Sequence, residues 1–129
     1  MSDPLPDLRG RVERITRDSP YPLDAYLFTM EALEFALRKL TEPRHISGRE
    51  MLEAVRTFGW ERFGFLAPEV FKHWSVHNTL DFGRIVFRLV ECGFMSKRPQ
   101  DRLEEFRDVY EFKEAFRRTL RCDAEEATG

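Results

Sequence analysis

His73, His77 and Asp81 are spaced four residues apart, as the ligands of a metal ion on one helical face would be. Imidazole and carboxylate groups in this arrangement can bind zinc. The surrounding chain argues against one continuous helix, because Asn78 and Thr79 are both typical residues for the cap of a new helix. A break there would turn the three side chains in different directions, and no further histidine or cysteine is close in sequence. We therefore predict no metal site.

The other reactive side chains lack the partners that catalysis requires. His45 could orient a loop or titrate near neutral pH. It precedes Ser47 and Glu50, which form a capping-box motif in which the hydroxyl and the carboxylate each cap a backbone amide. Ser47 has no adjacent base that would make it a nucleophile. The triplet Asp81–Gly83 matches the kinase motif DFG, but no glycine-rich loop accompanies it. We predict no enzyme activity and no cofactor.

The composition fits one domain over residues 1–122, followed by a flexible acidic tail at 123–129. The 129 residues are 42% hydrophobic, and 21 basic against 23 acidic residues give a net charge of -2. With so small a net charge, the protein as a whole has no electrostatic attraction to nucleic acid or to an anionic membrane. Cys92 and Cys122 are isolated from each other, which indicates no disulfide framework and suits a reducing cytoplasm. No segment reaches the ~18 apolar residues of a membrane span, so we predict a cytoplasmic protein.

Hydrophobic periodicity predicts N-terminal helices over residues 7–40. A short helix over 7–17, capped by Asp7, ends at the proline-rich stretch "DSPYPL". The strongest helix follows at 24–40, and apolar residues cover most of its circumference, namely Tyr26, Leu27, Phe28, Met30, Leu33, Phe35, Leu37 and Leu40. Such a helix is buried on several sides. It is either the central helix of the fold or part of a homodimer contact.

The pattern of helix and strand signals over residues 45–118 predicts a winged-helix-like unit. One helix runs from Ser47 to about Phe63, a second begins near Pro68, and a third runs over 79–92 and ends at Gly93. The segments "FMSK" (94–97) and "FRDVYEF" (106–112) are expected to pair as a short β-hairpin, before a last helix in "KEAFRRTLR" (113–121). The predicted fold class is therefore mainly α with a small β component (α+β). Fold alone does not indicate function.

The outer face of the helix over 79–92 separates two functional hypotheses. Its core stripe consists of Phe82, Ile85, Val86, Leu89 and Val90, which leaves Leu80, Asp81, Gly83, Arg84, Phe87, Arg88 and Glu91 facing outward. A DNA-recognition helix presents Arg, Lys, Asn or Gln to the base edges. Here Arg84 and Arg88 could contact phosphates, whereas Asp81 and Glu91 would repel them. In the wing, acidic neighbours offset Lys97, Arg98 and Arg102, which leaves few cations for a duplex.

Leu80 and Phe87 favour a protein partner over DNA. They lie seven residues apart and form an apolar strip flanked by charges, which is typical of a protein-binding face. Alternatively, the N-terminal helices cover this strip as core. We predict a non-enzymatic protein-interaction module with an unknown protein partner and the surface Leu80, Arg84, Phe87, Arg88, Lys97, Arg98 and Arg102. The alternative is a DNA-binding transcriptional regulator that uses the same helix and the wing.

Several segments agree in order with a known bacterial family. They are "AYLFTMEAL", "RHISGREMLEAVR", "HW", "LDFGRIVFRLVECGFMSK" and "FRDVYEF". Over about residues 8–117 the chain resembles a small uncharacterised family of similar length found in planctomycetes and verrucomicrobia. That family has no assigned activity, cofactor or partner. The resemblance therefore implies a stand-alone domain and transfers no site residues.

Overall fold

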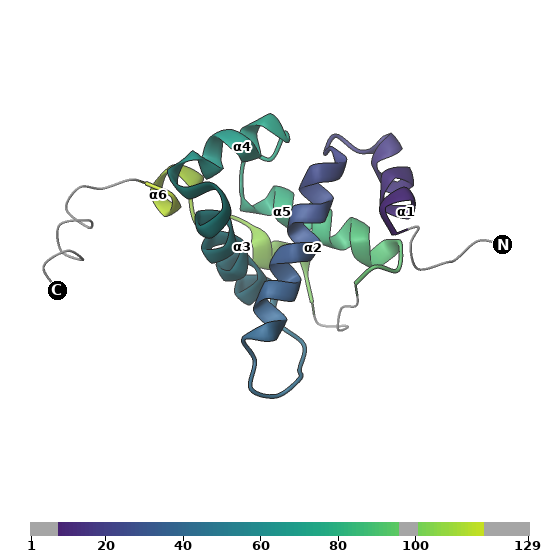
Figure 1. Ribbon diagram of the computed structural model, residues 1–129, viewed down its shortest axis with the longest axis horizontal. Coiled ribbons are helices and arrows are strands. Elements are labelled where there is room, and N and C mark those ends of the chain that lie inside the picture. Colours follow the sequence, from purple (N-terminus) through teal and green to yellow (C-terminus); the bar gives the residue numbers. More distant parts are fainter. Residues whose placement is uncertain (1–7, 96–100, 118–129) are drawn as a thin grey trace, which may run out of the picture.

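The computed structural model describes residues 8–95 and 101–117, and this part of the chain is helical (Figure 1). The α-helices are α1 (Leu8–Ile15), α2 (Leu23–Arg38), α3 (Gly48–Phe63), α4 (Ala67–His73), α5 (Thr79–Glu91) and α6 (Phe112–Ala115). Three short 3-10 helices connect them, η1 (Thr16–Asp18), η2 (Gly64–Leu66) and η3 (Leu103–Phe106). The prediction of a mainly helical chain is confirmed. None of the described helices has both the length and the apolar character that crossing a membrane requires.

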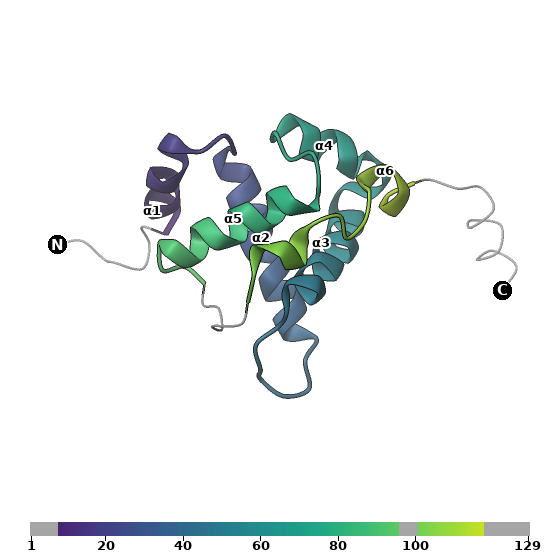
Figure 2. The same cartoon turned by 180° about the vertical axis from the view of Figure 1, so that it is seen from behind.

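α2 lies at the centre of the fold and packs against both α3 and α5 (Figure 1). α1 lies beside the C-terminal end of α5, whereas α4 and α6 lie together at the other end of the molecule (Figure 1). Seen from behind, η3 crosses α5 and α3 on the face opposite α2 (Figure 2). α3 and α5 are thus each held between α2 on one side and the C-terminal segment on the other.

Several predicted helix ends are confirmed, because short-range chemistry sets them. Ser47 caps α3 in a complete capping box with Glu50, and Asn78 caps α5 by accepting a hydrogen bond from the Asp81 amide at 3.1 Å. Pro68 lies in the first turn of α4. α5 ends at Glu91, and Gly93 two residues later has a φ of 86°, a conformation that favours glycine.

Aromatic side chains form the centre of the hydrophobic core. Phe28 of α2 contacts the rings of Phe58, Phe63, Phe71, Trp74 and Phe82 at centroid distances between 5.4 and 6.1 Å. Phe71 in turn contacts Phe112 and Phe116 near α6. Tilted and edge-on pairs of this kind contribute beyond the area they bury. The prediction that α2 is the central helix is confirmed by the burial of its side facing this cluster.

Among the residues that the structure describes, the predicted β-hairpin is wrong. Residues 106–112 contain the end of η3, a turn and the start of α6, and no strand occurs in the described ranges. The Thr79 hydroxyl donates to the Phe106 carbonyl and accepts from the Val109 amide at 3.1 Å. These bonds occupy backbone groups that a strand ladder would need. The other predicted strand continues past Met95 into residues outside the described ranges, where Asp7 and the 123–129 tail also lie. The last helix, predicted over 113–121, begins one residue earlier and already ends at Ala115, so its predicted extent is wrong at Phe116 and Arg117.

η3 covers the α5 face that the sequence predicted to be exposed. Phe106 is buried between two glycines, and a Cβ built on Gly83 would lie 2.6 Å from the Phe106 Cβ. On the α3 side, a Cβ built on Gly48 would lie 2.8 Å from the Phe106 ring. Leu80, Asp81 and Gly83, predicted to face outward, are buried, Gly83 against Phe106 and Asp81 against Tyr21. Of the predicted apolar strip, Leu80 belongs to the core, whereas Phe87 is half-buried against Phe106 of the predicted wing segment.

Candidate functional site

Two adjoining hollows follow α2 and together form what we call the α2 groove. The first has a volume of about 500 Å³ and lies between α2 and Phe94–Met95, with Leu27 and Met30 in its lining. The second has a volume of about 350 Å³ and is lined by Met51, Val86, Phe87 and Phe106 together with several polar side chains. Both hollows are lined by Leu33, Leu37 and Met95. They therefore lie side by side along one helix.

The groove arises because α2 has more apolar surface than its neighbours cover. Met30, Leu33 and Leu37 follow one another at three- and four-residue intervals, so they lie on one helical face. α3 and α5 pack on the side of α2 that carries Phe28 and Ala32, both of which are buried. Leu37 remains 43% exposed. The stripe predicted from the sequence is thus only partly used by the core.

A histidine–carboxylate pair lies in the second hollow. His45 Nε2 is 2.7 Å from Asp101 Oδ2, and both side chains are largely shielded from solvent. Glu105 lines the same hollow and accepts a hydrogen bond from the Gly48 amide at 3.3 Å. Ser47 is nearby, but its hydroxyl serves as the α3 cap. Ser47 provides the one hydroxyl or thiol among the described lining residues, and as a helix cap it is not available for activation by the pair as a nucleophile.

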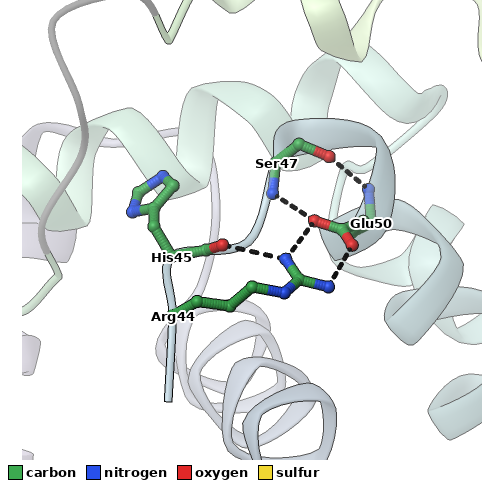
Figure 3. A network of polar contacts seen from close by, with 4 residues as sticks. All are labelled: Arg44, His45, Ser47 and Glu50. Carbon is green, nitrogen blue, oxygen red and sulfur yellow. Dashed lines mark hydrogen bonds and ion pairs between the residues drawn. The ribbon is translucent and has the colours of Figure 1, made fainter. Parts of the chain in front are cut away.

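Arg44 and Glu50 secure the entry to α3 beside this hollow (Figure 3). Arg44 Nη2 donates to Glu50 Oε2 at 2.8 Å, and Arg44 Nη1 donates to the His45 carbonyl at 3.0 Å. Ser47 donates its amide to Glu50 Oε1 at 2.8 Å (Figure 3). The hydrogen bonds from Arg44 and Ser47 lower the pKa of Glu50 to about 2. The carboxylate therefore remains ionised and keeps the loop before α3 in place.

We expect Ser47→Ala to lower the free energy of unfolding by about 1 kcal/mol, the usual contribution of a helix cap. The substitution removes the acceptor for the Glu50 amide, which Ser47 Oγ holds at 3.1 Å. Urea denaturation followed by circular dichroism measures the change. Ser47→Thr keeps the hydroxyl and is the matched control, with a loss of no more than a few tenths of a kcal/mol. Equal losses in the two variants would contradict the capping role.

Three arginines gather at the far end of the first hollow. Arg11 and Arg14 of α1 and Arg88 of α5 line a depression of about 290 Å³, with Cys92 and Phe94 between them. We call these three residues the arginine cluster. The Arg11 guanidinium stacks over the Phe94 ring at 4.8 Å from its centroid. Because Phe94 also lines the α2 groove, the cluster adjoins the groove.

The predicted interaction residues do not form one exposed face. Leu80 is only 8% exposed and belongs to the core. Phe87 is half-buried against Phe106 and lines the second hollow. Arg84 is exposed and pairs with Asp81 at 2.9 Å, and Arg88 belongs to the arginine cluster. Of the predicted wing residues, Arg102 is exposed, while Lys97 and Arg98 lie outside the described ranges.

The residues of the groove were only partly visible in the sequence. The stripe of Met30, Leu33 and Leu37 was recognisable, but its openness depends on where α3 and α5 pack. Met95 and Arg11 carried no signal of their own, because distant parts of the chain bring them to the groove. As for the metal hypothesis, the described part of the chain contains no cluster of three His, Cys, Asp or Glu residues that could hold an ion.

No protein-family model, curated protein or solved structure matches the chain. The resemblance to the bacterial family therefore stays a prediction. Function has to be argued from the groove and from the groups around it.

Proposed function

We propose that the protein is a non-enzymatic protein-interaction module that binds an amphipathic helix of a partner protein in the α2 groove. This keeps the interaction function predicted from the sequence but places the contact on α2 instead of the outer face of α5. The observation that carries the proposal is the stripe Met30, Leu33 and Leu37, which lines two adjoining hollows and includes a leucine that is 43% exposed. Contiguous apolar hollows of this kind are typical of partner-binding surfaces.

The shape and the lining of the groove suit a helical ligand. Leu27 and Leu37 are ten residues apart along α2, so the groove extends for ~15 Å at 1.5 Å per residue. That length matches about three turns of a bound helix, whose apolar side chains repeat at three- and four-residue spacings. Met30, Met51 and Met95 line the two hollows. Methionine side chains adapt to irregular apolar partners.

A DNA-binding regulator is the second hypothesis, and the arginine cluster is the observation in its favour. Two features weigh against it. First, Leu80, Asp81 and Gly83 of α5 are buried within the fold, so α5 cannot present that face to a major groove. Second, duplex binding rests on several phosphate contacts, and Arg84 is already paired with Asp81.

The test is a selection from displayed random peptides of about 15 residues, which span about 22 Å as helices. Recovered peptides are measured by fluorescence anisotropy against the wild type and Leu37→Asp. A charge placed in an apolar contact that borders both hollows removes a hot spot, so we expect Leu37→Asp to weaken binding about 30-fold, or about 2 kcal/mol. Leu37 is exposed, so the variant is expected to fold.

Leu66→Asp is the matched control, because Leu66 is 53% exposed on η2, outside the groove. It should leave the affinity for the peptides within about twofold. The proposal fails if no peptide is recovered, or if recovered peptides bind Leu37→Asp as well as the wild type. Analytical ultracentrifugation provides a further test. If the wild type is a homodimer and Leu37→Asp is a monomer, a second copy of the chain occupies the groove, and the proposal of a different partner protein is wrong.

A further inference from the structure

An apolar patch is exposed at the corner between α3 and α4. It consists of Trp60 in the last turn of α3 and of Phe65 and Leu66 in η2, and we call these three residues the corner patch. They are 45%, 46% and 53% exposed, and they are three of the four large apolar residues exposed in the described part of the chain. The patch is outside the α2 groove, so its occupant is independent of the proposed function. We propose that residues 118–122, which follow the described part of the chain, cover the corner patch with Leu120.

The C-terminal segment follows α3 toward the corner patch. Tyr110 donates a hydrogen bond to the Leu52 carbonyl at 2.6 Å. Six residues later, ring atoms of Phe116 lie 3.3 Å from a Cβ built on Gly59. The contact with α3 has thus moved by seven residues, about two helical turns, toward the C-terminal end of that helix. Trp60 comes directly after Gly59, so the segment is close to the corner patch where the described range ends.

Phe116 fixes the point at which the chain leaves the fold. Its side chain is buried, and its ring contacts that of Phe71 on α4 at a centroid distance of 5.5 Å. α6 therefore lies in the angle between α3 and α4, at the end of the molecule where η2 joins these two helices (Figures 1 and 2). Leu120 is four residues further on, and four extended residues span up to ~14 Å. One helical turn rises about 5.4 Å, so Leu120 can reach side chains one to two turns beyond Gly59.

The charges around the corner patch favour this segment over other occupants. Glu61 and Glu69 flank the patch in the sequence, and neither forms an ion pair within the described part of the chain. Lys72 on α4 is exposed, and the other neighbouring cations are already paired with carboxylates, namely Arg56, Arg62 and Arg117. An excess of negative charge therefore remains beside the patch. Residues 118–122 carry an arginine on each side of their leucine, which complements this charge, whereas an anionic membrane would be repelled.

The experiment places a bimane fluorophore on Cys122 of the full chain, in a Cys92→Ala background that leaves one thiol. Tryptophan quenches bimane only when the two rings are nearly in contact, so quenching reports a docked segment. We expect Trp60→Phe to remove the quenching, because phenylalanine keeps the apolar surface but not the quencher. Trp74 is buried and stays in both proteins. Leu120→Asp should shift the equilibrium at least about tenfold toward the undocked segment, since burial of a leucine contributes on that scale.

Ala124→Asp is the matched control, because it adds the same negative charge just beyond the proposed contact and should leave the quenching unchanged. Quenching that needs both Trp60 and Leu120 supports the proposal, and quenching that Trp60→Phe does not reduce overturns it. Trp60-dependent quenching that disappears on dilution would assign the patch to a second copy of the chain instead. No quenching, together with a Trp60-dependent blue shift of emission on vesicles of phosphatidylcholine and phosphatidylserine, would assign the patch to a membrane. Either result would also overturn the proposal.

Discussion

Gly83→Ala is expected to lower the free energy of unfolding by about 3 kcal/mol, the upper part of the range for overpacking a core. Gly83 lies inside α5, where alanine would normally stabilise a helix by about 1 kcal/mol. Here the added methyl would lie 2.6 Å from both Cβ and Cγ of Phe106. The Phe106 Cβ is fixed to the backbone, so a rotamer change cannot relieve the contact. η3 itself would have to move away from α5.

Such a movement is costly because η3 is tied to α5. The Thr79 side chain bonds to both Phe106 and Val109, and Tyr110 donates to the Leu52 carbonyl of α3 at 2.6 Å. Displacing Phe106 would strain these buried or partly buried hydrogen bonds, which are expensive to leave unmade. The destabilisation is thus a property of the whole C-terminal segment.

Gly59→Ala is the matched control for the helix propensity of alanine. Gly59 is also a buried glycine inside a helix, but the atoms nearest to its built Cβ are ring atoms of Phe116 and Phe71 at 3.3 Å. We expect a change within about 1 kcal/mol for this variant, because those rings need to shift by only a few tenths of an ångström. Urea denaturation followed by tryptophan fluorescence compares both variants. A Gly83→Ala protein that is as stable as the wild type would contradict the packing of η3 on α5.

The contrast between Gly83 and the helix caps explains how much of the fold was predictable. Ser47, Asn78 and Gly93 act on partners within five residues, so the sequence contains the whole interaction. The contact between Gly83 and Phe106 joins residues 23 positions apart, and no local pattern reveals it. One signal was available, since a glycine inside a helix is unfavourable unless another group approaches closely.

The same reasoning applies to the candidate site. The apolar stripe on α2 was predicted, but periodicity cannot tell which part of a wide stripe the other helices cover. Leu33 and Leu37 stay partly open because the side chains of α3 and α5 beside them, Met51 and Phe87, leave a hollow instead of filling the space. The arginine cluster requires α1 to lie against the end of α5, which is a tertiary arrangement. The net charge of a sequence segment counts these arginines together with acidic residues that lie far from them in the fold, so it does not reveal the cluster.

Asp81 joins the start of α2 to the start of α5 through a buried carboxylate. Its Oδ1 accepts hydrogen bonds from the Tyr21 hydroxyl and from Arg84 Nη1, and its Oδ2 accepts one from the His77 amide at 2.8 Å. Tyr21 lies sixty positions earlier in the chain, so this network was also invisible to local patterns. Burial, followed by the hydrogen bond to Asp81, raises the pKa of Tyr21 to about 12. Tyr21 is therefore a donor throughout the neutral range.

Asp81→Ala should lower the free energy of unfolding by about 3 kcal/mol at neutral pH, because several buried donors lose a charged acceptor together. Asp81→Asn keeps the shape and one acceptor, so we expect a smaller loss of about 1–2 kcal/mol. The exposed Glu61→Gln is the control for removing a negative charge and should stay within about 0.5 kcal/mol. Urea denaturation of the four proteins gives these differences.

The advantage of the wild type over Asp81→Asn is expected to disappear in acid. Burial acts to raise the pKa of Asp81, but the hydrogen bonds from Tyr21, His77 and Arg84 outweigh it, so the pKa is lowered on folding. A lowered carboxyl pKa contributes stability above the pKa of the unfolded chain, near 4, and this contribution is lost as the pH falls through the folded value. Denaturation curves from about pH 7 to about pH 3 should therefore show the two proteins converging only below about pH 4. A constant difference across that range would mean that the ionised Asp81 carboxylate does not hold α2 to α5.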